Sequence, residues 1–224
     1  MKKYFIGTSI LLSSFITPTF AEESDNFYLS VGGGMAFPSD VEGDANVGGT
    51  DINAAFETDN TGLLSISFGK EFNDLRFEIN YSRATVESDT LKVTSGGTAV
   101  AAAISPGIES KVNSYMLYGL KDFTNESKLT PYIGVGLGFA SLSGEDQIAT
   151  VAGTAYQLEG GSETVFSYAL KGGAAYEVAP NTSIYSEAMY QNFASYEVAE
   201  QGYTTVNYDS THYFAVSAGL KFNF

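Results

Sequence analysis

The sequence predicts an all-β protein, an eight-stranded antiparallel up-and-down transmembrane β-barrel with four long extracellular loops and short periplasmic turns. Three observations predict it. Apolar residues alternate with small or polar ones in eight segments, short and long connections between the segments alternate, and the chain combines 24 Gly with 15 Tyr and 16 Phe. A period of two gives each face of a strand one kind of side chain, and many glycines and aromatics on short strands are typical of barrels.

The beginning of the chain has the composition of a secretory signal peptide. Two lysines precede an apolar run, residues 4–16, which is too short to cross a bilayer as a helix, and Ala21 is a small residue at the expected cleavage site. We therefore expect residues 1–21 to be removed and residues 22–224 to form one barrel domain.

The eight segments have about ten residues each, the length that a tilted transmembrane strand requires. Their apolar faces are, in chain order, Phe27 to Phe37, Leu64 to Phe68, Leu75 to Tyr81, Met116 with Tyr118 and Leu120, Ile133 to Phe139, Phe166 to Val178, Ile184 to Tyr190, and Phe214 to Phe224. The last segment is the clearest, because every second residue from Phe214 onward is apolar. The chain closes on the aromatic Phe224, which we expect to be the C-terminal signal for the barrel-assembly machinery.

Connections between the segments alternate in length. Residues 73–74, 124–129 and 179–182 are short and rich in Asn, Asp and Pro, as turns are. The other four connections, near residues 38–60, 85–110, 143–163 and 194–211, run to roughly twenty residues each. This sorting is typical of a barrel whose two ends both lie on the periplasmic side.

A soluble eight-stranded barrel around a small ligand is the alternative architecture, with the apolar faces turned inward. It would place Gly134, Gly136 and Gly138 on a solvent-facing surface, where glycine weakens a strand and packs against nothing. The membrane barrel places them in a crowded interior.

Charged residues on the inward faces suggest a filled lumen. The predicted inward acids and bases are equal in number: Glu71, Glu78, Glu177 and Glu187 against Arg76, Lys121, Lys171 and Lys221. We expect a lumen charge network of Arg76, Glu78, Lys171, Glu187 and Lys221, with Tyr115, Tyr132 and Tyr185 filling the remaining space. Lys70, Arg83 and Asp122 are predicted to face outward at strand ends.

Several phrases resemble a known superfamily. LTPYIGVGLGFASL at residues 129–142, FSYALKGGAAYEVAPNTSIY at residues 166–185 and the closing GLKFNF are similar to small outer-membrane β-barrel proteins, which include OmpA-like domains and opacity porins. The order of the phrases looks most like the rickettsial surface antigen (major surface protein) family. The resemblance implies an integral protein of a Gram-negative outer membrane that contacts its lipid and displays loops at the cell surface, with no cofactor and no catalytic residues.

Three functions remain open: a structural or interaction role as a surface antigen, a narrow porin for small solutes, and an adhesin that binds a host factor through its loops. The net charge of −15 argues against a nucleic-acid partner. Balanced lumen charges argue against the porin, because selective pores are lined by one dominant sign. A surface hydrolase built from Ser210, His212 and Glu197 is the weakest alternative.

The four long connections contain 16 acidic residues and one basic residue, Lys92. Asp40, Glu42, Asp44 and Asn46 alternate in a way that calcium could use, but they lack the spacing of a dedicated calcium loop, so a solvated acidic surface is the expected role. Residues 96–104, GGTAVAAAI, are unusually apolar for a loop and suggest a lipid or protein contact, or a short helix on the rim.

Overall fold

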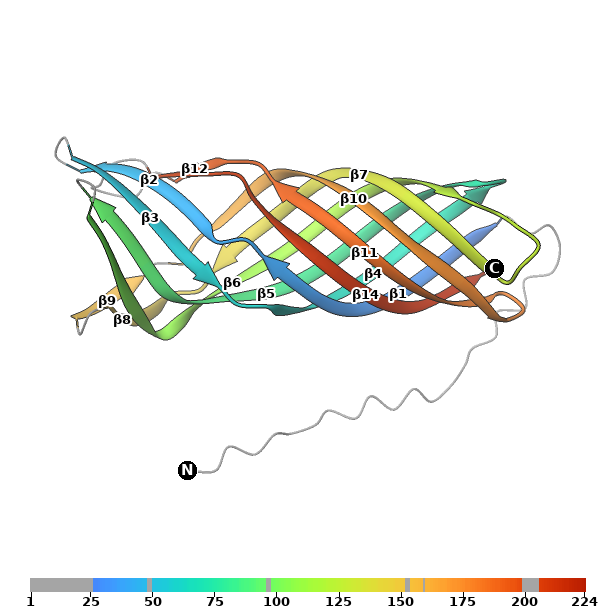
Figure 1. Ribbon diagram of the computed structural model, residues 1–224, viewed down its shortest axis with the longest axis horizontal. Helices are drawn as coiled ribbons and strands as arrows, with labels where there is room; N and C mark the ends of the chain where they lie inside the picture. Colours follow the sequence, from blue (N-terminus) through green and yellow to red (C-terminus); the bar gives the residue numbers. More distant parts are fainter. Residues whose placement is uncertain (1–25, 48–49, 96–97, 152–153, 159, 199–205) are drawn as a thin grey trace, which may run out of the picture.

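The computed structural model describes residues 26–47, 50–95, 98–151, 154–158, 160–198 and 206–224. These residues form a long antiparallel β-structure, drawn in Figure 1 with its axis horizontal. The strands are β1 (Phe27–Pro38), β2 (Val41–Val47), β3 (Thr50–Thr58), β4 (Thr61–Phe72), β5 (Leu75–Ser95), β6 (Thr98–Asp122), β7 (Leu129–Gly144), β8 (Gln147–Val151), β9 (Thr154–Leu158), β10 (Ser162–Ala179), β11 (Thr182–Phe193), β12 (Tyr196–Val198), β13 (Val206–Tyr208) and β14 (Thr211–Asn223).

Eight of these strands pair side by side in a ring. The order is β1, β4, β5, β6, β7, β10, β11, β14 and back to β1, and each neighbouring pair is antiparallel. The ring confirms the predicted fold class. Within the described residues, no helix is long and apolar enough to be a membrane span.

Short turns join the ring strands at one end, as predicted. Asn73 follows β4 with a φ of 56°, and Asn181 precedes β11 with a φ of 64°. Asn tolerates this left-handed backbone better than most residues do. In the turn between β6 and β7, the Asn125 side chain accepts a hydrogen bond from the Ser127 N–H at 2.7 Å and donates one to the Leu129 carbonyl at 2.9 Å.

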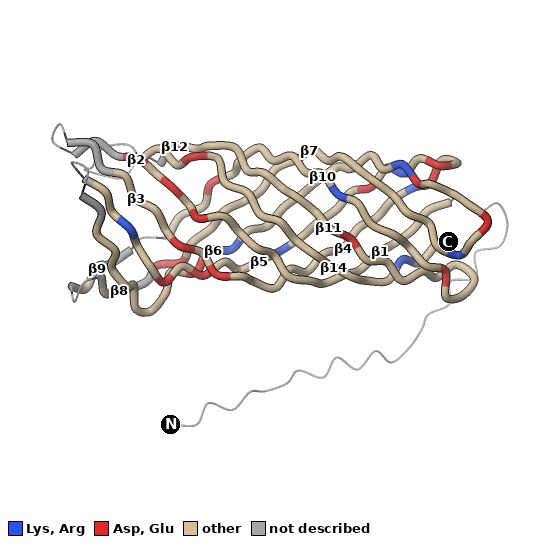
Figure 2. The backbone as a smooth tube through the Cα atoms, in the orientation of Figure 1, with Lys and Arg blue, Asp and Glu red and all other residues tan. Residues whose placement is uncertain are grey.

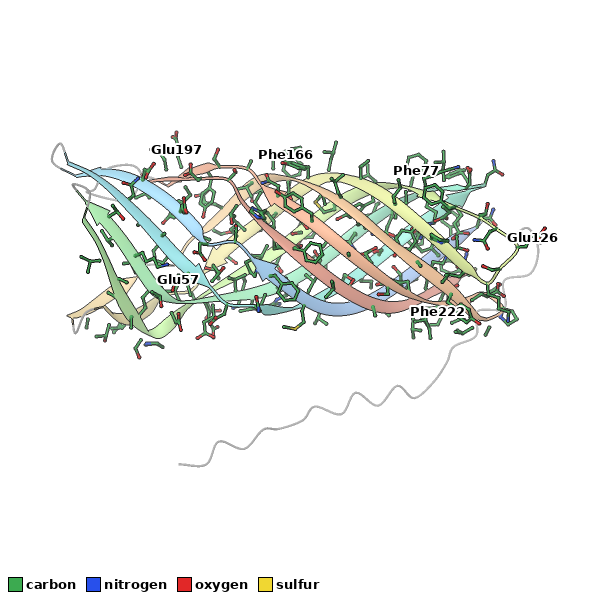
Figure 3. The ribbon with its side chains drawn as sticks, viewed as in Figure 1. Glu57, Phe77, Glu126, Phe166, Glu197 and Phe222 are labelled. Carbon is green, nitrogen blue, oxygen red and sulfur yellow. The ribbon has the colours of Figure 1, made fainter. Side chains whose placement is uncertain are left out.

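The apolar faces of the ring strands point away from the lumen, so the soluble alternative is wrong. Leu64, Ile79 and Val135 are 69%, 66% and 61% exposed. A continuous belt of such side chains would be an aggregation surface in water but suits hydrocarbon. Figure 3 shows Phe77, Phe166 and Phe222 along the outside of the barrel.

Aromatic residues border this belt on both sides. The border far from the turns consists of Phe37, Tyr81, Tyr115, Phe139, Phe166, Tyr190 and Phe214, with ring pairs such as Tyr81–Tyr115 at 5.2 Å. The next outward positions are polar: Arg83, Asn113, Ser141, Thr164, Asn192 and His212. From Phe214 to Phe224 the chain rises about 24 Å at a tilt near 45°, which matches a bilayer core.

The four long connections are where they were predicted, but their described parts are mostly β-strand. β2 and β3 form a hairpin that extends the sheet from β5, β13 pairs with β2 and β12, and β8 and β9 form a hairpin beside β6. We call this part the extramembrane wall: β2, β3, β8, β9, β12, β13 and the stretches of β5 and β6 beyond Arg83 and Asn113. It occupies the left end of Figure 1.

One ring strand faces the opposite way from its prediction. Met116, Tyr118 and Leu120 on β6 are 1–2% exposed and point into the lumen, whereas Tyr115 is 58% exposed and points to lipid. Both faces of this segment are apolar, so periodicity alone could not select one. The assignment of Tyr115 to the lumen was therefore wrong.

Glycines on β7 explain the orientation of β6. Gly138, Gly136 and Gly134 lie opposite Met116, Tyr118 and Leu120 in the β6–β7 register. A Cβ atom at Gly136 would lie 2.4 Å from Cε1 of Tyr118. Large side chains of one strand thus fill the space that the neighbouring glycines leave free, as predicted for a crowded interior.

We expect Gly136→Val to destabilise the barrel by about 1–3 kcal/mol, because its side chain overlaps the Tyr118 ring. Urea unfolding of the protein refolded in detergent micelles measures the change. Gly119→Val is the matched control, since a Cβ there meets no atom within 4 Å and points to lipid. Equal stability of the two variants would contradict this packing.

Candidate functional site

The centre of the lumen holds a lysine between two glutamates. Lys171 Nζ on β10 lies 2.7 Å from Glu78 Oε1 on β5 and 3.3 Å from Glu187 Oε2 on β11. The Lys171 and Glu78 side chains are each 4% exposed. Alternation along each strand turns all three inward, and barrel closure brings β5 across the lumen from β10 and β11.

Three tyrosines complete this cluster. Tyr28 donates a hydrogen bond to Glu78 Oε2 at 2.8 Å, and Tyr132 donates one to Glu187 Oε2 at 3.0 Å. The Lys171 ammonium also lies 4.1 Å from the centre of the Tyr118 ring. The buried charges therefore have hydrogen-bond and cation–π partners as well as opposite charges, which offsets part of their desolvation cost.

Nearer the turns, Arg76 pairs with Asp122, a partner that the sequence did not reveal. The Arg76 Nε donates to Asp122 Oδ1 at 3.0 Å, and the guanidinium lies 4.6 Å from the centre of the Tyr132 ring. Asp122 was predicted to face lipid and Lys121 the lumen. Both assignments were wrong for the same reason as Tyr115, namely the reversed face of β6; Lys121 instead pairs with Asp74 beside a turn.

A third pair lies at the turn end of the lumen. Lys221 Nζ is 2.7 Å from Glu71 Oε1, and the Asn223 amide donates to Glu71 Oε2 at 3.1 Å. Glu177, also predicted to point inward, is exposed at an irregularity in the β10–β11 register. In the described residues the lumen thus contains four acids and three bases: Glu71, Glu78, Asp122, Glu187, Arg76, Lys171 and Lys221.

Above the ion pairs, Gln191 forms a neutral polar cluster that sequence reasoning missed. Its amide group donates to Ser167 Oγ at 2.9 Å and to Ser114 Oγ at 3.1 Å, and its carbonyl accepts from the Tyr213 hydroxyl at 2.6 Å. Gln191 is 0% exposed. The sequence could not predict this burial, because a glutamine on the polar face of an amphipathic strand is ordinary and its three partners come from three other strands.

Little free space remains around these groups. A cavity of about 20 Å³ lies among Tyr28, Arg76, Glu78, Lys171 and other lumen residues, and a water molecule needs about 10–15 Å³. Tyr132 and Tyr185, predicted to fill the lumen, are both buried there. Toward the wall, the lumen continues as an apolar core that includes Leu63, Val165, Phe193 and Tyr213.

Outside the membrane, acidic residues cover the exposed side of the wall. In Figure 2 they gather along the end that carries β2, β3 and β12. In the part of the chain that the structure describes, ion pairs join Glu57 to Lys92 and Glu145 to Lys111. The hydrogen bond from Lys111 lowers the pKa of Glu145, and the one to Glu57 raises the pKa of Lys92.

The calcium candidates lie on or next to β2. The Asp40 carboxylate accepts from the Thr58 N–H at 3.4 Å, Asp44 accepts from the Asn53 amide, and Glu42 is exposed. The Asn46 side chain lies outside what the structure describes. In the described residues no group of three or more His, Cys, Asp or Glu side chains could hold a metal ion.

His212 packs against Tyr190 with its ring tilted by 37° and the ring centres 5.2 Å apart, just beyond the aromatic border of the belt. In the part of the chain that is described, its imidazole forms no hydrogen bond with Ser210 or Glu197. Residues 98–104 of the apolar loop segment belong to β6, so the short-helix alternative is wrong for them, and residues 96–97 lie outside the described residues. The Phe224 ring packs against the Phe68 ring, with ring centres 6.4 Å apart. The role of Phe224 as an assembly signal stays a prediction.

A closed ring with an apolar, aromatic-bordered exterior and a polar interior defines an integral β-barrel protein of the Gram-negative outer membrane. The chain belongs to the family of outer membrane protein beta-barrel domains, which matches residues 8–222. A search of curated proteins gives no match. The narrower resemblance to rickettsial surface antigens and the signal peptide stay predictions.

Solved structures show the same fold. Neisserial surface protein A (NspA) is 21% identical with a TM-score of 0.55, covering 91% of this chain and 100% of its own. OprG from Pseudomonas aeruginosa is 15% identical with a TM-score of 0.55, covering 88% and 96%. The outer membrane protease OmpT from Escherichia coli is 11% identical with a TM-score of 0.52, covering 92% and 99%.

We expect Lys171→Met to destabilise the refolded barrel by about 3–5 kcal/mol, because two buried carboxylates lose their counter-ion. Urea unfolding in detergent micelles measures this change in the free energy of unfolding. Lys121→Met, which breaks a half-exposed pair at the turn end, should cost about 1 kcal/mol or less.

The triple variant Glu78→Gln, Lys171→Met, Glu187→Gln should regain most of the loss, because it leaves no unpaired buried charge. A Lys171→Met barrel as stable as Lys121→Met would show that the central cluster is not desolvated as described.

Proposed function

We propose that the protein is a non-catalytic surface protein, in which a sealed barrel anchors the extramembrane wall in the outer membrane for display and interaction. The observation that carries the proposal is the filled lumen. Lys171 between Glu78 and Glu187 fills its middle, and the cavity of about 20 Å³ beside these residues has room for no more than one or two water molecules.

The opposite ends of the barrel support display on the cell surface. Outer-membrane barrels have short turns on the periplasmic side and long segments on the extracellular side. The three short turns here share one end, and the wall with most of the acidic residues lies at the other, where Figure 3 labels Glu57 and Glu197 against Glu126 at a turn. We therefore assign the wall to the cell exterior.

The surroundings of His212 support a non-catalytic role. A nucleophile needs a base within hydrogen-bond reach and a group that orients this base. His212 instead faces outward at the upper border of the belt and contacts the Tyr190 ring, as interfacial aromatic side chains do.

A sealed barrel should show no steady conductance in planar lipid bilayers. The narrow porin would instead give steady openings whose size or selectivity changes in the Glu187→Gln variant, since this removes a lumen charge. Such openings in the unmodified protein would contradict the proposal.

Surface display can be tested with single cysteines, because the chain has no native Cys. We expect Ala101→Cys on the wall to react with a membrane-impermeant maleimide on intact cells, since Ala101 is exposed. Asn125→Cys in a turn should react only after the outer membrane is permeabilised. The reverse pattern would invert the assigned orientation.

A further inference from the structure

The extramembrane wall has one apolar and one acidic face. Val41, Phe56, Leu91 and Ala102 are register neighbours across β2, β3, β5 and β6, so they share a face. They are half-buried, whereas Glu42 and Lys92 on the opposite face are exposed. Thr58, two residues from Phe56, pairs with the buried Ser88, so the apolar face is the one continuous with the lumen.

This inner face is only partly covered. Val93 and Val100 are direct partners on it near the tip of the β5–β6 hairpin, and Val100 is 62% exposed. An apolar sheet face left partly open to water in this way marks a surface that a partner can cover.

The wall extends farther beyond the barrel on the side of β5 and β6, its high side, than on the side of β7, β10 and β11, its low side. β5 continues to Ser95 and β6 begins at Thr98, whereas β7 ends at Gly144, β10 begins at Ser162 and β11 ends at Phe193. Among the described strands, β9 and β12 terminate the sheet order, so the wall is open above β7, β10 and β11. Figure 1 shows β2, β3 and β12 on one side of this end and β8 and β9 on the other.

Acidic residues border the low side. Asp146 follows β7 and Glu163 lies at the start of β10, and both are exposed. Neither of them forms an ion pair within the described residues. Glu163 has the same strand parity as the buried Val165, so it faces the mouth of the lumen. Burial, Tyr208 and Glu163 together raise the pKa of Tyr196, the inner-face residue whose ring stacks on Tyr208, to about 12.

We propose that the inner face of the wall binds a cationic amphipathic polypeptide segment, with its apolar side on Val41, Phe56, Leu91 and Val100 and its Lys or Arg side chains toward Asp146 and Glu163. Charge complementarity selects this occupant: anionic amphiphiles are repelled by the acidic border, and a purely apolar ligand leaves it without a partner. Cationic amphipathic segments concentrate at membrane surfaces, the level at which the wall opens. The inference rests on the proposed surface display and names the partner class.

The test uses the full barrel refolded in a nonionic detergent and a short fluorescent peptide of Leu and Lys arranged as an amphipathic helix. Fluorescence anisotropy should show saturable binding. The same peptide with Ser in place of Leu, or with Glu in place of Lys, should bind at least about tenfold more weakly. Equal binding of the Leu–Lys and Ser–Lys peptides would reduce the interaction to charge alone and overturn the proposal, as would no binding.

Matched variants locate the site. Val100→Gln on the inner face should weaken binding about fivefold or more, whereas Ile148→Gln, 65% exposed on the outer face, should leave it unchanged. Glu163→Gln should weaken binding more than Glu87→Gln, an outer-face substitution that removes the same charge. Equal losses within each comparison would overturn the assignment. Conductance and cysteine labelling test the proposed function separately, so failure of peptide binding alone leaves that function standing.

Discussion

Backbone hydrogen bonding in hydrocarbon is the constraint on which the rest of this structure depends. A bilayer core offers no water to an unpaired N–H or C=O group, so every strand in it needs a partner on both sides. The ring from β1 round to β14 meets this requirement, with β1 paired to β14 from Tyr28 to Pro38. Closure turns alternate residues inward and outward, so one choice of register determines both the lipid surface and the contents of the lumen.

The narrow lumen that closure creates decides how the interior is built. Eight strands leave only enough space for side chains, and the interior is filled in two ways. Tyrosine rings lie over glycines, such as Tyr118 over Gly136 and Tyr28 over Gly69. Charged groups are joined across the lumen, with Lys171 reaching Glu78 and Glu187. An interior filled in both ways leaves little free space in the described part of the lumen.

Outside the bilayer the same sheet continues, but water instead of hydrocarbon surrounds its outer face. Beyond Arg83 and Asn113 the outer face meets water and becomes acidic, while the inner face stays apolar as far as Val93 and Val100. The sheet no longer has to close, because water can satisfy an edge strand. The wall therefore extends farther over β5 and β6 than over β7, β10 and β11, and this asymmetry leaves part of its inner face exposed.

The sequence by itself determined the number of ring strands, their turns and the outward direction of seven of the eight apolar faces. It did so because hydrophobic alternation and turn residues such as Asn73 and Asn181 act locally. Tertiary structure decided the rest. The face of β6 depends on the glycines of β7, so Tyr115, Lys121 and Asp122 were assigned wrongly together, and the partners of Gln191 and Arg76 come from strands far apart in the chain. The long connections also contain alternation, as in Leu91 and Val93, but their strands exist only because β5 and β6 provide edges for pairing. Local pattern sets which residues can form a strand, whereas its neighbours decide which face it buries and how far it extends.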